Sequence, residues 1–398
     1  MQPREVSSFV STPLPADAPL GVYLHIPFCT RICPYCDFNT YAHQEDLIPD
    51  YVEALIGEMD LARDLALAGD RPAATLYFGG GTPSLLQPEQ VARLIEAVRE
   101  RFALPSDGEI SLEANPEDVD AGKLRGFRDA GVNRISLGVQ TQQRQGLKVL
   151  GRGHKPEVPE RALAAARSAG IASFSVDFIF GWPGQMLDDW EADLDAILAW
   201  KPDHLSLYSL IVEPGTPYER AVRRRILRVP DEDATAEMYE RAIERLAAAG
   251  WHHYEVSNWA REPRHRSEHN LIYWRNGHYF GFGAGAHAHL GDQRSSNIRL
   301  PGAYIESVRA GELPIAMRED LGQEVRMAET MFLGLRLPED GVSAEAFEAR
   351  HGHRLVEVYG RQLEELTALG LIEWDGRLAR VTPRGLLVAN VVEERFLP

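Results

Sequence analysis

Three cysteines on one short segment are the residues of this 398-residue chain whose types and spacing best suit chemistry. Cys29, Cys33 and Cys36 are its only cysteines, and they stand together in C-T-R-I-C-P-Y-C. Thiolates on one loop can each ligate a different iron of a [4Fe–4S] cluster, which normally takes four such ligands. Because the chain has no fourth cysteine, the spacing predicts a cluster with one iron open to a non-protein ligand.

A zinc site is the alternative reading of this triplet, with His25 or His43 completing a set of three cysteines and one histidine. Structural zinc usually takes two C-x2-C pairs from separate hairpins, and the chain has no second pair. The odd number of cysteines also disfavours a disulfide framework. The triplet therefore favours an iron–sulfur cluster over zinc.

Two predicted strands position the cysteine segment and a glycine-rich turn. The apolar run G-V-Y-L-H-I-P-F (21–28) directly precedes the first cysteine, and a second run, A-T-L-Y-F (74–78), is followed by G-G-G-T-P (79–83). Glycines at such a turn let the backbone approach a ligand closely and present N–H groups to it. A glycine triplet by itself more often makes an ordinary turn. The two loops together are much more specific than either one.

Strand-like and helix-like stretches alternate through the first 211 residues, which predicts a parallel sheet because each parallel connection needs a crossover. Six units rather than eight indicate an α/β fold with an incomplete (β/α)6 barrel, whose ligand sites lie at the C-terminal ends of the strands. The strands are expected at 21–26, 74–78, 109–113, 134–139, 173–180 and 204–211, and the helices at 50–68, 87–102, 117–130, 156–169 and 188–200.

The pattern changes after residue 230, where a long helix (231–249) is expected. The C-terminal stretch predicts a smaller winged-helix-like α+β domain with helices at 323–335, 343–351 and 354–369, a hairpin at 371–382 and a final helix at 383–395. The expected organisation is a loose lead-in (1–20), the barrel (21–250), a connecting segment (251–315) and the C-terminal domain (316–398).

Charge and composition exclude several classes of partner. The net charge is −17, and residues 316–398 hold ten arginines, no lysine and fifteen acidic residues, so nucleic acid is not an expected partner. No run approaches the roughly 18 apolar residues of a membrane span, so an integral membrane protein is not expected. Clustered, unpaired thiols suit a reducing compartment, which favours the cytoplasm. The sequence leaves open whether the chain forms a homodimer.

Polar residues stand at or near the ends of the predicted strands. Tyr23 lies on the first, Glu113 ends the third, Gln140 ends the fourth and Asp177 lies in the fifth, while Arg152 follows in L-G-R-G-H. Each alone could be a buried, hydrogen-bonded polar group. Together they surround one mouth of the predicted barrel.

With its cysteine loop and G-G-G-T-P turn, the chain resembles the radical S-adenosylmethionine (SAM) superfamily, and within it the coproporphyrinogen dehydrogenase-like group. The resemblance is strongest over residues 20–290. It implies that the cysteines hold the cluster and that an electron from the cluster cleaves SAM to a radical, a step that the cofactor performs. The positions that match contacts to the cluster-bound SAM are Tyr23, Gly80 and Glu113, and those that match contacts to a second SAM are Tyr35, Gly81, Thr82, Gln140, Arg152, Asp177 and Ile211.

Two differences from coproporphyrinogen dehydrogenases, and one motif, indicate which member of this group the chain resembles most. Coproporphyrinogen dehydrogenases carry a further cysteine where this chain has Phe38, and a longer segment before the first strand. H-N-L-I-Y-W (269–274) matches the H-N-x-x-Y-W motif of the HemW family of heme chaperones. The resemblance therefore implies heme binding and delivery of heme to acceptor proteins. The alternative is an oxygen-independent oxidase that decarboxylates two porphyrinogen propionates.

The motif also has a direct chemical interpretation. An imidazole can ligate heme iron axially, so His269 is the predicted heme ligand, with Tyr273 and Trp274 offering aromatic faces to the porphyrin. The alternative is a structural histidine packed among aromatic neighbours. Six further histidines are rival ligands: His252, His253, His265, His278, His287 and His289.

Overall fold

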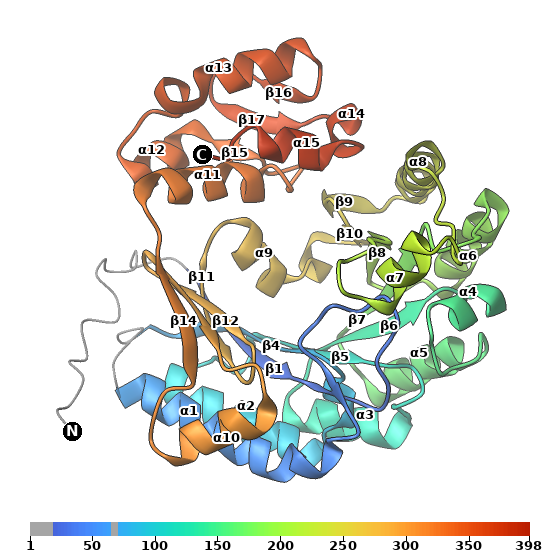
Figure 1. The fold of residues 1–398 in the computed structure, drawn as a ribbon, viewed down its shortest axis with the longest axis vertical. Helices are drawn as coiled ribbons and strands as arrows, with labels where there is room; N and C mark the ends of the chain where they lie inside the picture. The colour runs from blue at the N-terminus through green and yellow to red at the C-terminus, as the bar shows by residue number, and fades with distance from the viewer. Residues whose placement is uncertain (1–18, 65–70) are drawn as a thin grey trace.

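A twelve-stranded mixed sheet forms the body of the protein in the computed structural model, which describes residues 19–64 and 71–398 (Figure 1). Most of the predicted lead-in, residues 1–18, lies outside the described residues. Across the sheet the strands are β14 (Ile315–Asp320), β13 (Gln293–Asn297), β12 (His287–Leu290), β11 (His278–Phe282), β1 (Leu20–Ile26), β4 (Ala73–Gly80), β5 (Glu109–Ala114), β6 (Arg134–Gln140), β7 (Ser173–Phe180), β8 (His204–Ser209), β10 (Asn258–Ala260) and β9 (His252–Glu255).

The six predicted strands are confirmed as β1, β4, β5, β6, β7 and β8, neighbours in this order and all parallel. Residues on both faces of β1 and β4 are buried or half-buried, as expected of parallel strands that crossover helices cover. In the described part of the chain β14 and β9 are the two edges, so the predicted incomplete barrel is confirmed. The crossover helices are α1 (Ile48–Asp64), α2 (Pro88–Phe102), α3 (Ala121–Ala130), α4 (Arg144–Val149), α5 (Val158–Ala169) and α6 (Leu187–Trp200).

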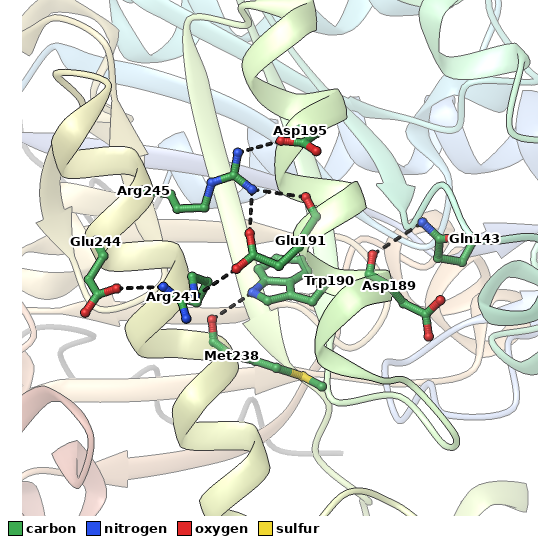
Figure 2. A network of polar contacts seen from close by, with 9 residues as sticks. All are labelled: Gln143, Asp189, Trp190, Glu191, Asp195, Met238, Arg241, Glu244 and Arg245. Carbon is green, nitrogen blue, oxygen red and sulfur yellow. Dashed lines mark hydrogen bonds and ion pairs between the residues drawn. The ribbon is translucent and has the colours of Figure 1, made fainter.

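The last barrel helix is covered by α8 (Glu232–Ala248), and polar contacts orient the pair (Figure 2). The indole of Trp190 donates to the Met238 carbonyl at 2.7 Å inside the interface. Glu191 accepts from Arg241 at 2.8 Å and from Arg245 at 2.6 Å. Because these ion pairs are partly solvated, the buried aromatic packing stabilises the contact more than the charges do.

The stretch 251–315 adds strands to both sides of the same sheet. Strands β9 and β10 lie beyond β8, while β11, β12 and β13 lie beyond β1. Between them the chain crosses the concave side of the sheet through the short helix α9 (Glu268–Trp274), drawn between the sheet and the C-terminal domain in Figure 1.

The crossing segment binds the first residues of several barrel strands. The backbone N–H of His269 donates to Glu109 at 3.1 Å, and Arg134 donates to the His265 carbonyl at 2.9 Å. The His265 ring in turn bonds Ser173 at 3.1 Å. Glu109, Arg134 and Ser173 each begin a strand, so α9 closes the N-terminal end of the barrel.

The predicted winged-helix-like domain is confirmed in α11 (Gln323–Gly334), β15 (Val342–Ser343), α12 (Ala344–His351), α13 (Leu355–Ala368), β16 (Ile372–Trp374) and β17 (Leu378–Val381), with sheet order β15-β17-β16. The predicted final helix is wrong. It is two short helices, α14 (Pro383–Leu386) and α15 (Ala389–Glu394), because Val388 takes a non-helical conformation with φ −128° and ψ 35°. The domain packs on the crossing segment, where the Arg336 guanidinium lies over the Trp274 ring and pairs with buried Glu255 at 2.7 Å.

Candidate active site

A cavity of about 420 Å³ opens at the C-terminal ends of the barrel strands, the end that the fold class predicts for ligands. It lies opposite the end that α9 closes. All of the predicted site residues except Tyr23 and His269 line it. These are Cys29, Cys33, Cys36, Tyr35, Gly80, Gly81, Thr82, Glu113, Gln140, Arg152, Asp177 and Ile211.

The cysteine loop closes one side of this cavity. Its two ends are tied together, since β2 (Phe28–Cys29) pairs with β3 (Tyr41–Ala42). All three thiols are free; Cys29 accepts a hydrogen bond from Thr82 at 3.4 Å, and Cys33 accepts one from Arg152 at 3.8 Å. Burial raises the pKa of Cys29 to about 11, so that thiol becomes a thiolate at neutral pH only with a nearby cation such as iron.

The surroundings of the loop disfavour the zinc alternative. Both ring nitrogens of His25 are already bonded, one to the Tyr23 hydroxyl at 2.9 Å and one to the Asn39 carbonyl at 2.9 Å. His43 is exposed. Within residues 19–64 and 71–398, no three His, Cys, Asp or Glu side chains converge on a single ion. Separate thiolates around a cavity fit a cube, in which each cysteine holds its own iron.

The glycine turn after β4 allows a close approach of two backbones. A Cβ on Gly81 would lie 2.7 Å from the Phe28 carbonyl oxygen, and its N–H donates to the Ile26 carbonyl at 2.8 Å. Gly80 has φ 110°, a conformation that favours glycine. The glycines therefore let two protein backbones pack closely, and the Gly81 N–H binds the strand before the cysteines instead of facing the cavity. A close approach of this turn to a ligand stays a prediction.

Two carboxyl groups face the cavity from neighbouring parts of the barrel. Glu113 accepts from the Tyr77 hydroxyl at 2.8 Å, and Asp177 accepts from the Ser136 hydroxyl at 2.8 and 2.9 Å. Burial raises the pKa of Glu113 to about 7 and also raises the pKa of Asp177. A cationic ligand group would favour the ionised form of both.

The Arg152 guanidinium places a positive charge beside the cysteine loop, in the same cavity as these two carboxyl groups. Arg152 donates to Asn115 at 2.5 Å and to the Gly138 carbonyl at 2.8 Å, while its Nε is buried without a partner among the described residues. A buried N–H without a partner is rare and suits an anionic ligand atom. Gln140, at the end of β6, has φ 71°, a strained conformation of the kind that clusters at functional sites.

Tyr23 and His269 lie inside the barrel, outside the cavity lining. His269 is 1% exposed, and its Nδ1 and Nε2 bond the Thr75 hydroxyl at 2.7 Å and the Tyr273 hydroxyl at 2.8 Å. The ring stacks on Tyr77 with centroids 5.0 Å apart, and Tyr77 stacks in turn on Tyr23.

This geometry does not support the predicted axial ligation of heme by His269, because both ring nitrogens are engaged and the ring is buried. Tyr273 and Trp274 likewise do not offer free faces: the Tyr273 ring meets Tyr279 edge-on at 4.5 Å, and Trp274 is covered by Arg336. The motif therefore has a structural role in the described conformation.

Sequence reasoning missed several polar residues that hold the site residues in place. Asn115 bonds Arg152, Ser136 bonds Asp177 and Tyr77 bonds Glu113. Asn39 joins the cysteine loop to residues near 284 and 299. A signal was present for two of them, since Asn39 stands in C-D-F-N beside the cysteines and Asn115 follows Glu113 at the same strand end.

Comparison with known proteins identifies two family models and several relatives. Residues 23–197 match the model of the radical SAM superfamily, and residues 321–388 match the HemN C-terminal domain. The heme chaperone HemW of Bacillus subtilis is 38% identical over 95% of this chain and 99% of its own length. HemW of Escherichia coli is 37% identical over 95% of this chain and 98% of its own length.

Two further comparisons extend these. The mitochondrial radical S-adenosyl methionine domain-containing protein 1 of Mus musculus is 36% identical over 100% of this chain and 92% of its own length. Among solved structures, coproporphyrinogen III oxidase (HemN) of Escherichia coli superposes with a TM-score of 0.82 over 98% of this chain and 92% of that one. Its sequence identity is 23%, so this likeness shows the fold alone.

Proposed function

This chain belongs to the HemW family of radical SAM proteins, and we propose that it is a heme chaperone that holds a SAM-ligated [4Fe–4S] cluster and delivers heme to acceptor proteins. One observation carries the cluster part of the proposal. Three unpaired thiols, two carboxyl groups and a guanidinium with an unsatisfied N–H line a single cavity. Cys29, Cys33 and Cys36 are the proposed iron ligands.

When bound to the reduced cluster, SAM supplies radical chemistry that no side chain of the chain can supply. The protein's residues bind and orient it. Glu113 suits the ammonium group of the cluster-bound SAM, while Asp177 and the unpartnered Nε of Arg152 suit the cationic groups and the carboxylate of a second SAM. We assign contacts with the cluster-bound SAM to Gly80 and Glu113, with Tyr23 as an indirect contributor, and contacts with a second SAM to Tyr35, Gly81, Thr82, Gln140, Arg152, Asp177 and Ile211. Tyr23 acts from beneath the cavity, through its bond to His25.

The heme part rests on the family and on Phe38, which stands where coproporphyrinogen dehydrogenases carry a cysteine and which is 67% exposed at the cavity mouth. We propose that the chain does not oxidise coproporphyrinogen. The partners are heme and heme-accepting proteins, and the site of action is the cytoplasm, where free thiols persist. In the described residues no helix is long and apolar enough to cross a membrane.

Two assays on the same anaerobically reconstituted preparation test the proposal. Hemin titration should give a saturable Soret band, and the loaded protein should transfer heme to apomyoglobin used as a neutral acceptor. Incubation with coproporphyrinogen III, SAM and a reductant should give no protoporphyrinogen IX. Turnover to protoporphyrinogen, or the absence of saturable heme binding, would overturn the assignment.

A further inference from the structure

The six histidines that were alternatives to His269 as the heme ligand differ in whether the imidazole ring is exposed and without a hydrogen bond. His252 lies 3.8 Å from Glu339, and His253 stacks on Trp259 with centroids 4.1 Å apart. The remaining bonded or buried rivals are His265, His278 and His289. His287 is exposed, and among the described residues its ring makes no hydrogen bond or ion pair.

His287 lies at the same edge of the sheet as the cysteine cavity. It begins β12, which runs antiparallel to β11, while β11 runs parallel to β1. The first residue of β12 therefore lies beside the C-terminal ends of β11 and β1, from which the cysteine loop departs. In the register, His287 is opposite Ser296, which is opposite Met317, so these three share one face.

Asn39 fastens the segment that carries His287 to the cysteine loop. Its side-chain amide donates to the Ala284 carbonyl at 2.9 Å and to the Arg299 carbonyl at 3.0 Å, and its Oδ1 accepts from Arg299 Nε at 3.2 Å. A Cβ on Gly285 would lie 2.4 Å from the Asn39 amide nitrogen, so the turn before β12 fits closely against this side chain.

The surface around Asn39 combines apolar area with a cation. Phe38, next to Asn39 in the chain, is 67% exposed, and Leu300, next to Arg299, is 61% exposed. Met317, on the same sheet face as His287, is 46% exposed, and exposed apolar side chains of this size often mark binding surfaces. Arg299 is exposed and has no carboxylate partner among the described residues. Partial burial, followed by the charges of Arg294 and Arg299, lowers the pKa of His287 below its usual value.

We propose that heme docks on this surface, with its iron ligated by His287, its apolar edge against Phe38 and Leu300, and a propionate on Arg299. The inference rests on the proposed heme-chaperone function and replaces His269 by His287 as the ligand. A planar apolar ring with two carboxylates matches a surface that presents exposed apolar side chains, an imidazole and an unpaired guanidinium. Because Phe38 also lines the cluster cavity, the heme would lie at the rim of the SAM site.

Hemin titration of the reconstituted full-length protein tests this site, with the Soret band and the Kd as readouts. His287→Ala should shift the Soret band and weaken binding about tenfold, equivalent to ~1.4 kcal/mol. Added imidazole should restore the wild-type band. Phe38→Ala and Arg299→Gln should weaken binding without shifting the band, since neither touches the iron.

His353→Ala is the matched control, because this histidine is also exposed but belongs to the C-terminal domain, and it should leave both readouts at wild-type values. Iron content and thermal unfolding check that each variant is folded. If wild-type protein binds no heme, the proposed function fails. If wild type binds heme and His287→Ala keeps its band and affinity, or if His43→Ala shifts the band instead, this site is refuted while the function stands.

Discussion

Replacing His269 by alanine separates the structural role of the H-N-x-x-Y-W motif from a heme-ligating role. The ring is held at the N-terminal end of the barrel by Thr75 and Tyr273 and lies against Tyr77. It also meets β1 closely, since a Cβ on Gly21 would lie 3.3 Å from its Cε1. The variant therefore removes a buried side chain that packs between α9 and strands β1 and β4.

The size of the effect follows from these contacts. Two buried hydrogen bonds of about 1 kcal/mol each are lost, and the Thr75 and Tyr273 hydroxyls lose the ring that they bond. The cavity left by the ring adds a further cost of about 1–3 kcal/mol, by analogy with large-to-small core substitutions. We expect His269→Ala to lower the free energy of unfolding by about 3–5 kcal/mol.

Urea unfolding, followed by tryptophan fluorescence, measures this loss. The control is His252→Ala, because His252 is exposed and has only a long contact to Glu339, so its effect should stay within about 0.5 kcal/mol. A His269→Ala protein with wild-type stability and no Soret band would refute this reasoning. That result would restore His269 as the heme ligand.

Three further perturbations test other parts of the structure. Cys33→Ala should abolish the cluster by iron count and absorbance, and a full iron complement in this variant would exclude the assigned ligands. Asn39→Ala should release cluster iron to a chelator several-fold faster than wild type, because the loop loses its side-chain bonds to Ala284 and Arg299; Asn390→Ala, at an exposed position, should not. Burial raises the pKa of Glu58 from 4.5 to about 7, so its contribution to stability is present below pH 4.5 and is lost as the pH rises through 7. Glu58→Gln should therefore gain about 3 kcal/mol relative to wild type between pH 4.5 and 8, by 1.36 kcal/mol for each pKa unit, and parallel pH–stability curves for the two proteins would contradict the raised pKa.

The sequence predicted the barrel strands because each is an apolar run followed by an amphipathic helix, a local pattern. It also predicted the cavity lining, since residues at the C-terminal ends of parallel strands must meet at one edge of the sheet. Strand β13, Q-R-S-S-N, has no apolar alternation, so its place in the sheet depends on pairing with distant partners. Such non-local pairing leaves no local signal.

The position of His269 could not be predicted for a related reason. Nothing in H-N-L-I-Y-W says which end of the barrel the helix closes, and that end decides whether the imidazole meets a ligand or the core. The break at Val388 was missed because the apolar spacing continues through it. The close packing of Gly385, where a Cβ would lie 2.0 Å from the Leu371 carbonyl oxygen, is visible only in three dimensions.

Electron paramagnetic resonance of the reduced, reconstituted protein tests the central claim most directly, that this cavity holds a cluster whose open iron is ligated by SAM. The measurement compares the spectrum before and after SAM is added, in wild type and in Glu113→Gln. The account predicts the signal of one reduced [4Fe–4S] cluster per chain, a change in its shape on SAM addition, and a weaker response to SAM in the variant with the cluster intact. A wild-type spectrum that SAM leaves unchanged would contradict it.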